Sequence, residues 1–319
     1  MEYRWERTFP FLEVSSATIK KLFKGILKEC DINNIIPIDS GCRTTNYIVE
    51  SNNLEKKYIL KIFFIKGQDY KKEIKLLNFL RNSKFVPVPE VYRVSEDEDI
   101  GNREYAIYEY IEGKTIGQAI REGYSLEDSF VRNVARALAK IHSYKFSKVG
   151  ALDECLHIRE ELPPLVSWYE SFMGDIAKKR LGKTIVNDIN RVVRKNEKAL
   201  RDLDKDPRLV HGDFQGTNII IKNKMLAGIL DWEFVIAGHP LADIGQFFRY
   251  EEYFNRKLIE AFEYEYNKFS DYKLTQNWYN ISKLRDLVNL IQLIGTNEEM
   301  PIKHESIKKI IINTLSVFD

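Results

Sequence analysis

The first third of the chain alternates apolar and polar residues in short runs that are typical of β-strands. Two segments depart from this alternation and have helical spacing instead. The first is residues 16–28, which Ser15 or Ser16 could cap, and the second is residues 69–81, whose apolar face consists of Ile74, Leu77 and Leu80. The pattern predicts a β-sheet accompanied by two helices.

The pattern changes at Gly113, after which apolar residues recur at three- and four-residue steps. Residues 126–142 are a clear example of this helical spacing. Only residues 208–231 return to short strand-like runs. We therefore predict an α+β fold of two lobes, with a small β-sheet lobe at residues 1–112 and a larger, mainly helical lobe at residues 113–319.

Composition and charge are those of an ordinary globular protein. The chain has 319 residues, of which 44% are hydrophobic and 30% are charged. A net charge of +2, with basic and acidic residues interspersed, argues against a nucleic-acid or membrane partner. The three scattered cysteines favour a reducing compartment, and no apolar run reaches the ~20 residues that span a bilayer. We expect a cytoplasmic monomer.

The most informative motif is His-Gly-Asp213, followed five residues later by Asn218. The same Asp-x-x-x-x-Asn spacing recurs twice upstream, once in a polar turn and once in a helix where the two residues face different sides. Only at Asp213 do two apolar, β-branched runs around a turn follow, which predicts a hairpin. Counting outward from its midpoint places Asn218 opposite Asp231, so that one divalent ion could contact both side chains.

These residues suit phosphoryl transfer to a hydroxyl group. Mg²⁺ prefers oxygen ligands and keeps several waters, so Asn218 and Asp231 are predicted metal ligands. Asp213 is the predicted catalytic base that accepts the proton of the incoming hydroxyl, as in kinase-type enzymes. The purely structural alternative is an Asx turn at Asp213 and a surface carboxylate at Asp231.

A lysine inside an upstream strand adds a second element. Lys61 lies in an apolar run and would be costly to bury without a partner. Glu73, in the helix predicted at residues 69–81, is the expected partner, because kinases use such a strand lysine and helix glutamate to hold nucleotide phosphates. Alternatively, Lys61 is an edge-strand lysine that reaches solvent.

Two further segments could contact a nucleotide. In residues 39–46, backbone amides and the hydroxyls of Ser40, Thr44 and Thr45 could cradle phosphate, although an ordinary hairpin loop would have the same sequence. The strand that leads to Gly113 could offer backbone groups of Glu109 and Ile111 to an adenine edge, with Tyr108 behind it.

At this point the chain resembles the aminoglycoside phosphotransferase and choline kinase family of small-molecule kinases. The resemblance rests on residues 60–62, 73, 108–113, 138–143, 211–218, 229–233 and 238–243. His-Gly-Asp in place of His-Arg-Asp, and Asp-Trp-Glu in place of Asp-Phe-Gly, set it apart from protein kinases.

The resemblance implies a protein-kinase-like fold, with ATP or GTP and Mg²⁺ as cofactors. It also implies Asp213 as base, Asn218 and Asp231 as magnesium ligands, and Lys61 with Glu73 as the phosphate clamp. The chain departs from the protein-kinase pattern in its phosphate loop, where Gly41 is the only glycine.

Three polar residues are expected to support the catalytic loop. His142 should pack or hydrogen-bond near this loop, and His211 should hold it through its ring nitrogens. Asp243 could accept backbone amides from the loop, or it could cap the helix that starts near His239.

The acceptor is the least explicit prediction. Residues 251–265 are rich in glutamate and could receive a polycationic aminoglycoside, although a solvated helix face with an i,i+4 pair of Glu252 and Arg256 explains most of them. Glu233 is the better single candidate, because it would point to the same side of an extended strand as Asp231.

An aminoglycoside-type antibiotic is therefore the leading acceptor, which would make the chain a resistance enzyme. The alternatives are a choline, ethanolamine or sugar-metabolite kinase and a catalytically silent binding protein. Five aromatic residues leave a choline-like acceptor open, although their helical spacing places them first in the core: Trp168, Tyr169, Phe172, Trp278 and Tyr279.

Overall fold

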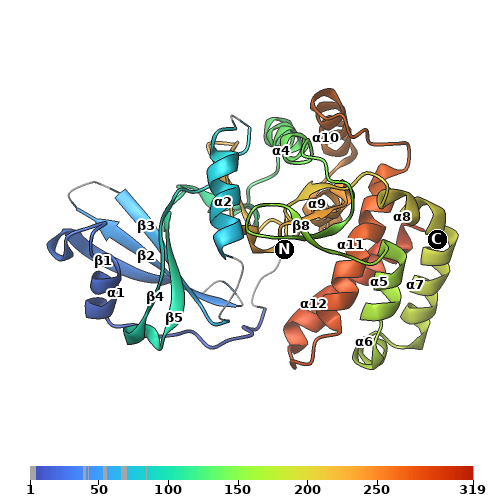
Figure 1. Ribbon diagram of the computed structural model, residues 1–319. Coiled ribbons are helices and arrows are strands. Elements are labelled where there is room, and N and C mark those ends of the chain that lie inside the picture. Colours follow the sequence, from blue (N-terminus) through green and yellow to red (C-terminus); the bar gives the residue numbers. More distant parts are fainter. Residues whose placement is uncertain are drawn as a thin grey trace.

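The computed structural model describes residues 5–318 except 39, 40, 42, 53–55, 66–69 and 84. Its first part is a five-stranded antiparallel sheet in the order β1-β2-β3-β5-β4 (Figure 1). The elements of this part are β1 (Ile32–Ile38), β2 (Thr44–Ser51), β3 (Lys56–Phe63), β4 (Val91–Asp97), β5 (Arg103–Glu109), α1 (Ser16–Leu22) and α2 (Tyr70–Arg81).

The two faces of this sheet belong to different cores. On β3, Leu60 and Ile62 pack into a core with α1, whereas Phe63 packs into the core that continues into the rest of the molecule. Successive side chains of a strand point to opposite faces, so Lys61 also points away from the α1 core. This alternation directs Lys61 toward the second part of the chain.

The two predicted helices of this part differ in outcome. The helix predicted at residues 69–81 is confirmed as α2. The first helix is capped by Ser15, whose hydroxyl accepts a hydrogen bond from the Thr18 amide at 3.1 Å. It ends at Leu22, however, and its predicted extension to residue 28 is wrong, because the chain turns at Gly25 with a φ of +87°.

The second part carries two smaller sheets, ordered β11-β10-β6 and β8-β7-β12-β9. Residues 208–231 form strands as predicted, whereas β6, β7, β8 and β12 were not predicted. Strands of two or three residues, such as β6, β7 and β12, are too short to leave a periodic pattern. The strands are β6 (Lys114–Thr115), β7 (Gly150–Leu152), β8 (Ile158–Glu161), β9 (Arg208–Val210), β10 (Ile219–Lys222), β11 (Met225–Ile229) and β12 (Ile236–Gly238).

Helices make up most of the second part and confirm the predicted α+β, kinase-like architecture. The central α11 is buried along most of its length and packs against α5, α9 and α12. The helices are α3 (Ile116–Arg121), α4 (Asp128–Ile141), α5 (Leu165–Phe172), α6 (Asp175–Leu181), α7 (Lys183–Lys195), α8 (Glu197–Leu203), α9 (Pro240–Phe247), α10 (Arg256–Phe269), α11 (Trp278–Ile294) and α12 (Pro301–Ser316).

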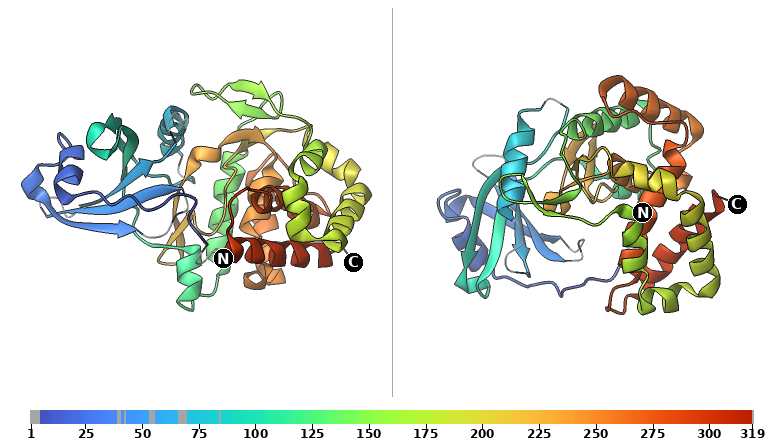
Figure 2. Two further views of the ribbon diagram at one scale, coloured as in Figure 1. Left: turned by 90° about the horizontal axis from the view of Figure 1, so that it is seen from below. Right: turned by 45° about the vertical axis from the view of Figure 1, so that its right-hand side comes forward.

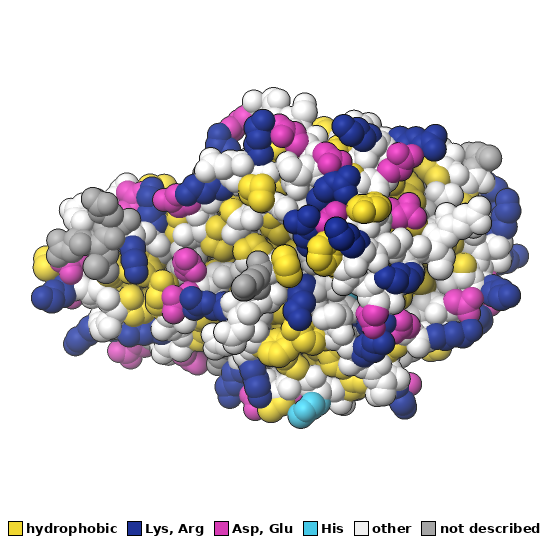
Figure 3. Space-filling model, turned by 90° about the horizontal axis from the view of Figure 1, so that it is seen from above, with side chains coloured by type: hydrophobic (Ala, Val, Ile, Leu, Met, Phe, Trp, Pro, Cys, Tyr) yellow, Lys and Arg dark blue, Asp and Glu magenta, His cyan; other side chains and the backbone are white. Residues whose placement is uncertain are grey.

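The surface agrees with the mixed charge of the sequence. On the face drawn in Figure 3, basic and acidic side chains are interspersed and do not form a patch of one sign. Among the described residues, no helix is both long enough and apolar enough to cross a bilayer.

Candidate active site

The loop between β9 and β10 brings Asp213 and Asn218 together. The side-chain amide nitrogen of Asn218 donates to the Asp213 backbone carbonyl at 2.9 Å and to its carboxylate Oδ2 at 2.8 Å. Because both bonds use Nδ2, the side-chain oxygen Oδ1 of Asn218 is left as a possible ligand for a cation. The pair therefore combines a carboxylate with an oriented amide oxygen.

Buried polar side chains hold this loop in place through hydrogen bonds. The Asp243 carboxylate accepts the amides of His211 at 2.8 Å and Gly212 at 2.9 Å, and it bonds Nε2 of His142 at 3.1 Å. The ring of His211 contacts the Leu230 carbonyl at 2.9 Å and accepts the Asp213 amide at 3.2 Å. These contacts confirm the supporting roles predicted for His142 and His211. Asp243 accepts loop amides and does not cap α9.

Two supporting residues were missed. Gln246 accepts the Phe214 amide at 2.6 Å and donates to the Gly212 carbonyl at 2.8 Å. Arg249 donates to the Gln215 side chain at 2.8 Å and forms a bidentate ion pair with Asp286 at 2.7 and 2.8 Å. Gln246 lies three residues beyond Asp243 on α9, and Arg249 lies three residues further, just after the helix ends at Phe247. This spacing of polar residues could have identified both.

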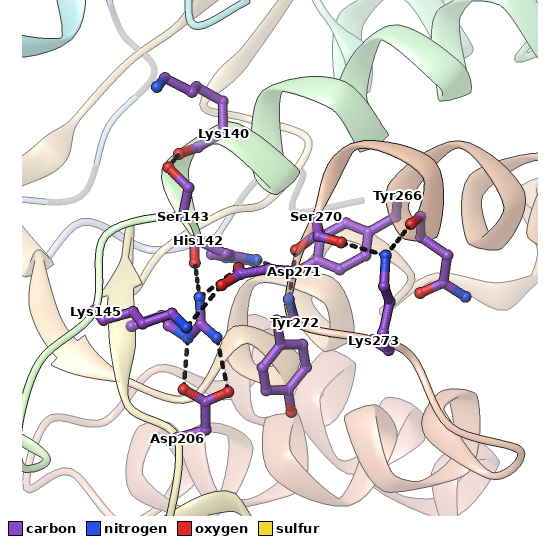
Figure 4. Close-up of polar contacts among 12 residues, drawn as sticks. Lys140, His142, Ser143, Lys145, Asp206, Tyr266, Ser270, Asp271, Tyr272 and Lys273 are labelled. Atoms are coloured by element: carbon purple, nitrogen blue, oxygen red, sulfur yellow. Dashed lines mark hydrogen bonds and ion pairs between the residues drawn. The ribbon is translucent and has the colours of Figure 1, made fainter.

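The strand that leads into the loop is fixed by a buried arginine. The guanidinium of Arg208 donates to the His142 carbonyl at 3.0 Å, to Asp271 at 2.7 Å and to both carboxylate oxygens of Asp206 at 2.7 and 2.8 Å. Figure 4 shows Asp206, Asp271 and Lys145 close together, and Lys145 pairs with Asp271 at 2.7 Å. A planar guanidinium suits such bidentate contacts, so Arg208 anchors the end of α4 to β9.

The hairpin after the loop forms in a different register from the predicted one. Its turn is Asn223-Lys224, with φ angles of +50° and +66°, and an irregularity shifts the pairing between Ile220 and Ile221. The Leu230 amide consequently bonds the Asn218 carbonyl at 2.8 Å, so Asn218 lies opposite Leu230 and the predicted pairing with Asp231 is wrong by one residue. Asp231 still follows directly, in a left-handed conformation with a φ of +65°.

Lys61 meets Asp231 across the two parts of the chain, at a distance of 2.5 Å between Nζ and Oδ1. The expected direct pair with Glu73 is not formed among the described side chains. Glu73 instead accepts the Tyr108 hydroxyl at 3.3 Å. It nevertheless lies near enough to act on Lys61 electrostatically.

The pKa shifts in this cluster follow from burial and charge. Burial would lower the pKa of Lys61, but Asp231 and Glu73 outweigh it and raise that pKa well above its ordinary value. Burial likewise opposes the ionisation of Asp231, yet the charge and hydrogen bond of Lys61 bring its pKa below the usual value. Burial raises the pKa of Glu73. The lysine and Asp231 are therefore a charged pair.

Glu233 lies close to Asp231, as predicted, but in a different backbone conformation from the predicted one. Residues Trp232–Phe234 form a 3₁₀ turn, so the extended strand expected after Asp231 is wrong. Burial and the neighbouring Asp231 carboxylate raise the pKa of Glu233 to about 7. Lys61 and Arg43 act in the opposite direction. Glu233 is thus a half-buried carboxyl group next to the Asp231 site.

The predicted phosphate loop is only partly described, and Ser40 lies outside the described residues. Thr44 begins β2 and is buried, with its hydroxyl donating to Asn46 at 3.4 Å. Thr45 is fully buried, and its hydroxyl accepts the Leu12 amide at 2.9 Å. Both hydroxyls make hydrogen bonds within the protein, and the phosphate contact of these two residues stays a prediction.

The segment after β5 offers backbone groups near the junction of the two parts. The Glu109 amide already donates to the Glu90 carbonyl at 2.8 Å, so this amide is not available to a ligand. The Ile111 side chain packs so closely on Gly228 that a Cβ there would lie 2.6 Å from it. Tyr108 is buried behind this segment.

The acidic stretch is mostly engaged with basic groups of the protein. Glu265 pairs with two arginines of α4, Glu251 pairs with Lys283, and Glu260 pairs with Arg256. The predicted i,i+4 pair of Glu252 and Arg256 is wrong, because Glu252 lies in a separate 3₁₀ turn, Glu251–Tyr253. The aromatic residues pack as expected of core residues, with Trp278 against Phe262 and Trp168 against Phe172.

The molecule has a two-part, kinase-like architecture. Lys61 of the five-stranded sheet contacts the Asp231 carboxylate of the second part, next to the loop that carries Asp213 and Asn218. The family model described as phosphotransferase enzyme family matches residues 34–276, and the chain belongs to this family.

Solved structures share the fold. A thermostable mutant of aminoglycoside phosphotransferase APH(4)-Ia, in ternary complex with AMP-PNP and hygromycin B, is similar with a TM-score of 0.67 and 14% identity over 94% of this chain and 98% of that one. Choline kinase LicA from Streptococcus pneumoniae has a TM-score of 0.62 and 20% identity over 94% and 98%.

A curated relative is much longer than this chain. Acyl-CoA dehydrogenase family member 11 of Pongo abelii is 25% identical over 186 residues, which is 57% of this chain. The match covers 23% of that protein, so the chain spans about a quarter of this relative's length.

Proposed function

We propose that the protein transfers the γ-phosphoryl group of ATP, or of GTP, to a hydroxyl group of a small molecule. The observation that carries the proposal is the meeting of distant polar residues at one place: the loop pair Asp213 and Asn218, and the interlobe pair Lys61 and Asp231. Burying charged groups is costly even when they are paired, and clusters of buried ionisable groups with shifted pKa values often mark functional sites.

Asp213 is the proposed catalytic base. It accepts the proton when the acceptor O–H bond breaks, the acceptor oxygen bonds to phosphorus, and the bond between the γ-phosphorus and the β–γ bridging oxygen breaks to release the nucleoside diphosphate. The Asn218 amide holds the Asp213 carboxylate in place at 2.8 Å. Lys61, charged at neutral pH because of its carboxylate neighbours, is the proposed phosphate contact.

The donor set suits a magnesium ion. Among the described residues, no group of three or more His, Cys, Asp or Glu side chains could enclose a metal. Mg²⁺ needs no such enclosure, because it takes one or two protein oxygens and completes its shell with water and phosphate. The free Oδ1 of Asn218 and the Asp231 carboxylate would hold it, and a bound ion would supply charge neutralisation on the phosphates.

We propose residues 1–112 as the nucleotide-binding lobe and residues 113–319 as the catalytic and acceptor-binding lobe. The Glu109 carbonyl and backbone groups of Ile111, at the junction, are the proposed adenine contacts. Ser40 and Thr44 remain proposed phosphate contacts.

The leading acceptor class is an aminoglycoside, with choline, ethanolamine or a sugar metabolite as alternatives. Similarity to the APH(4)-Ia complex supports the first and similarity to LicA supports the second. Glu251, Glu260 and Glu265 pair with cations of the protein, which weakens the acidic stretch as a support for a polycation. Glu233 is the proposed acceptor contact, because it is the carboxyl group nearest in sequence to Asp231.

The test is ADP release by purified protein with Mg²⁺ and ATP or GTP, across aminoglycosides, choline, ethanolamine and small sugars. Asp213→Ala should lose about 10²-fold or more of the acceptor-stimulated rate while still binding nucleotide. Asp128→Ala is the matched control, because Asp128 begins the Asp-x-x-x-x-Asn spacing on α4. Full turnover by Asp213→Ala would contradict the assignment of the base, and a wild type that neither turns over nor binds nucleotide would contradict the whole proposal.

A further inference from the structure

Residues 5–14 run from one part of the molecule to the other. From Glu6, which bonds the first turn of α12, the segment crosses to the five-stranded sheet (Figure 2). The Glu6 carboxylate accepts the amides of Ile302 at 2.8 Å and Lys303 at 3.0 Å. The Lys303 ammonium lies 5.6 Å from the centre of the Trp5 ring. Free amides at a helix start favour a carboxylate, so this end is firmly held.

The other end of the segment is attached to β2. The Leu12 amide donates to the Thr45 hydroxyl at 2.9 Å, and the Tyr47 hydroxyl donates to the Leu12 carbonyl at 2.7 Å while it accepts the Val14 amide at 3.0 Å. Phe11 packs edge-on against the Tyr47 ring, with 5.4 Å between the ring centres. The segment is therefore anchored at both of its ends.

Arg7 lies between these anchors and contacts the predicted phosphate loop. Its guanidinium donates to the Gly41 carbonyl, and to the Thr44 carbonyl at 2.6 Å, while Nε donates to the Phe9 carbonyl at 3.1 Å. The two loop carbonyls are three residues apart, so one rigid guanidinium fixes both ends of this short stretch.

The stretch that Arg7 holds carries Arg43. The Arg43 guanidinium lies 5.6 Å from the centre of the Phe234 ring, and its charge acts on Asp231 and Glu233. Gly41 has a φ of +118°, a conformation that few residues other than glycine adopt. The position of the loop over the Asp231 site thus depends on residues far away in the sequence.

We propose that Arg7 is a positioning residue for nucleotide binding, and that residues 5–14 tie the phosphate loop to α12 through Arg7 and Glu6. The inference rests on the proposed function, because the position of the loop matters to a ligand only if nucleotide phosphates bind beneath it.

The experiment is a calorimetric titration of the full chain with Mg²⁺ and ADP, so that no acceptor is needed. Arg7→Ala should weaken ADP binding about tenfold, the loss expected for one charge-assisted hydrogen bond. Arg7→Lys, which keeps the charge but not the bidentate geometry, should recover part of this affinity. Arg256→Ala is the control, because Arg256 is an exposed arginine on α10, and its affinity should equal that of the wild type.

Combining Arg7→Ala with Glu6→Ala tests whether the segment acts as a unit. If it does, each single change weakens ADP binding and the double variant is little weaker than Arg7→Ala alone. A lowered melting temperature with unchanged ADP affinity in both Arg7 variants would overturn the inference, since Arg7 would then be merely structural. A wild type that binds no nucleotide would overturn the proposed function as well, which distinguishes the two failures.

Discussion

Gly212 is the position at which one methyl group should most disturb the catalytic loop. It lies between His211 and Asp213 with a φ of +82°. A Cβ added there would lie 2.3 Å from the Phe234 carbonyl oxygen and 3.1 Å from the Phe234 carbonyl carbon. Backbone atoms cannot rotate away as the end of a flexible side chain can, so Gly212→Ala must displace the Asp213 loop or the segment after Asp231.

Gly182 provides a matched control for the backbone strain. Its φ is +83°, and a Cβ there would meet nothing within 4 Å. Both alanine variants should lose about 1–3 kcal/mol of stability from the unfavourable conformation. Gly212→Ala should lose a further ~1–3 kcal/mol, the usual cost of overpacking.

Urea unfolding of the two variants and the wild type measures this difference directly. Acceptor-stimulated ADP release should be retained by Gly182→Ala and largely lost by Gly212→Ala, because only the second change moves the proposed base. Equal losses of stability in the two variants would refute the reasoning, since the contact with Phe234 would then not constrain the loop.

Two further predictions concern buried ionisable side chains. The neutral ring of His239 accepts Nε–H of Arg285 at 2.9 Å and bonds Asp204 at 2.9 Å, and burial lowers its pKa from 6.5 to about 4. Because the folded pKa is depressed, His239 should contribute about 3 kcal/mol to the free energy of unfolding above pH 6.5, and this contribution should be lost as the pH falls to 4. The stability of His239→Gln should therefore depend less on pH in this range than that of the wild type. Equal pH dependence of the two proteins would show that His239 is not the source of the acid sensitivity. Lys61→Met should weaken Mg²⁺-ADP binding about tenfold or more, whereas Lys71→Met, at an exposed position of α2, should not, and equal affinities in a titration would rule out Lys61 as a phosphate contact.

The parts of the site that could be predicted are those within a short stretch of sequence. Asp213 and Asn218 are five residues apart, and their spacing, followed by a hairpin, is sufficient to suggest that they meet. The helical periods of α2, α4 and α11 likewise identify these elements, because each has an apolar face of three turns or more. The wrong end of α1 is a local failure, since a single glycine turn ended the helix inside a run of helical spacing.

The register of the hairpin could not be predicted from the same pattern. Its turn requires positive φ at Lys224, which is unusual for lysine, and an irregular step in the pairing moves Asn218 by one residue against its partner strand. Neither feature changes the alternation of apolar residues that the prediction used. The partner of Lys61 was missed because its contact with Asp231 joins residues 170 positions apart in the sequence.

The residues that support the catalytic loop could be predicted in part, because their spacing in the sequence is informative. Asp243, Gln246 and Arg249 recur at steps of three, as apolar core residues do, yet all three are polar and buried. Polar residues with a core-like period must satisfy one another or a backbone segment, because burial without partners would be costly. Here Asp243 and Gln246 bond the amides of residues 211, 212 and 214 in the catalytic loop, and Arg249 bonds the Gln215 side chain. A polar stripe at helical spacing just after a candidate catalytic motif is therefore evidence about that motif, because a loop held by several buried bonds is one whose geometry must be kept.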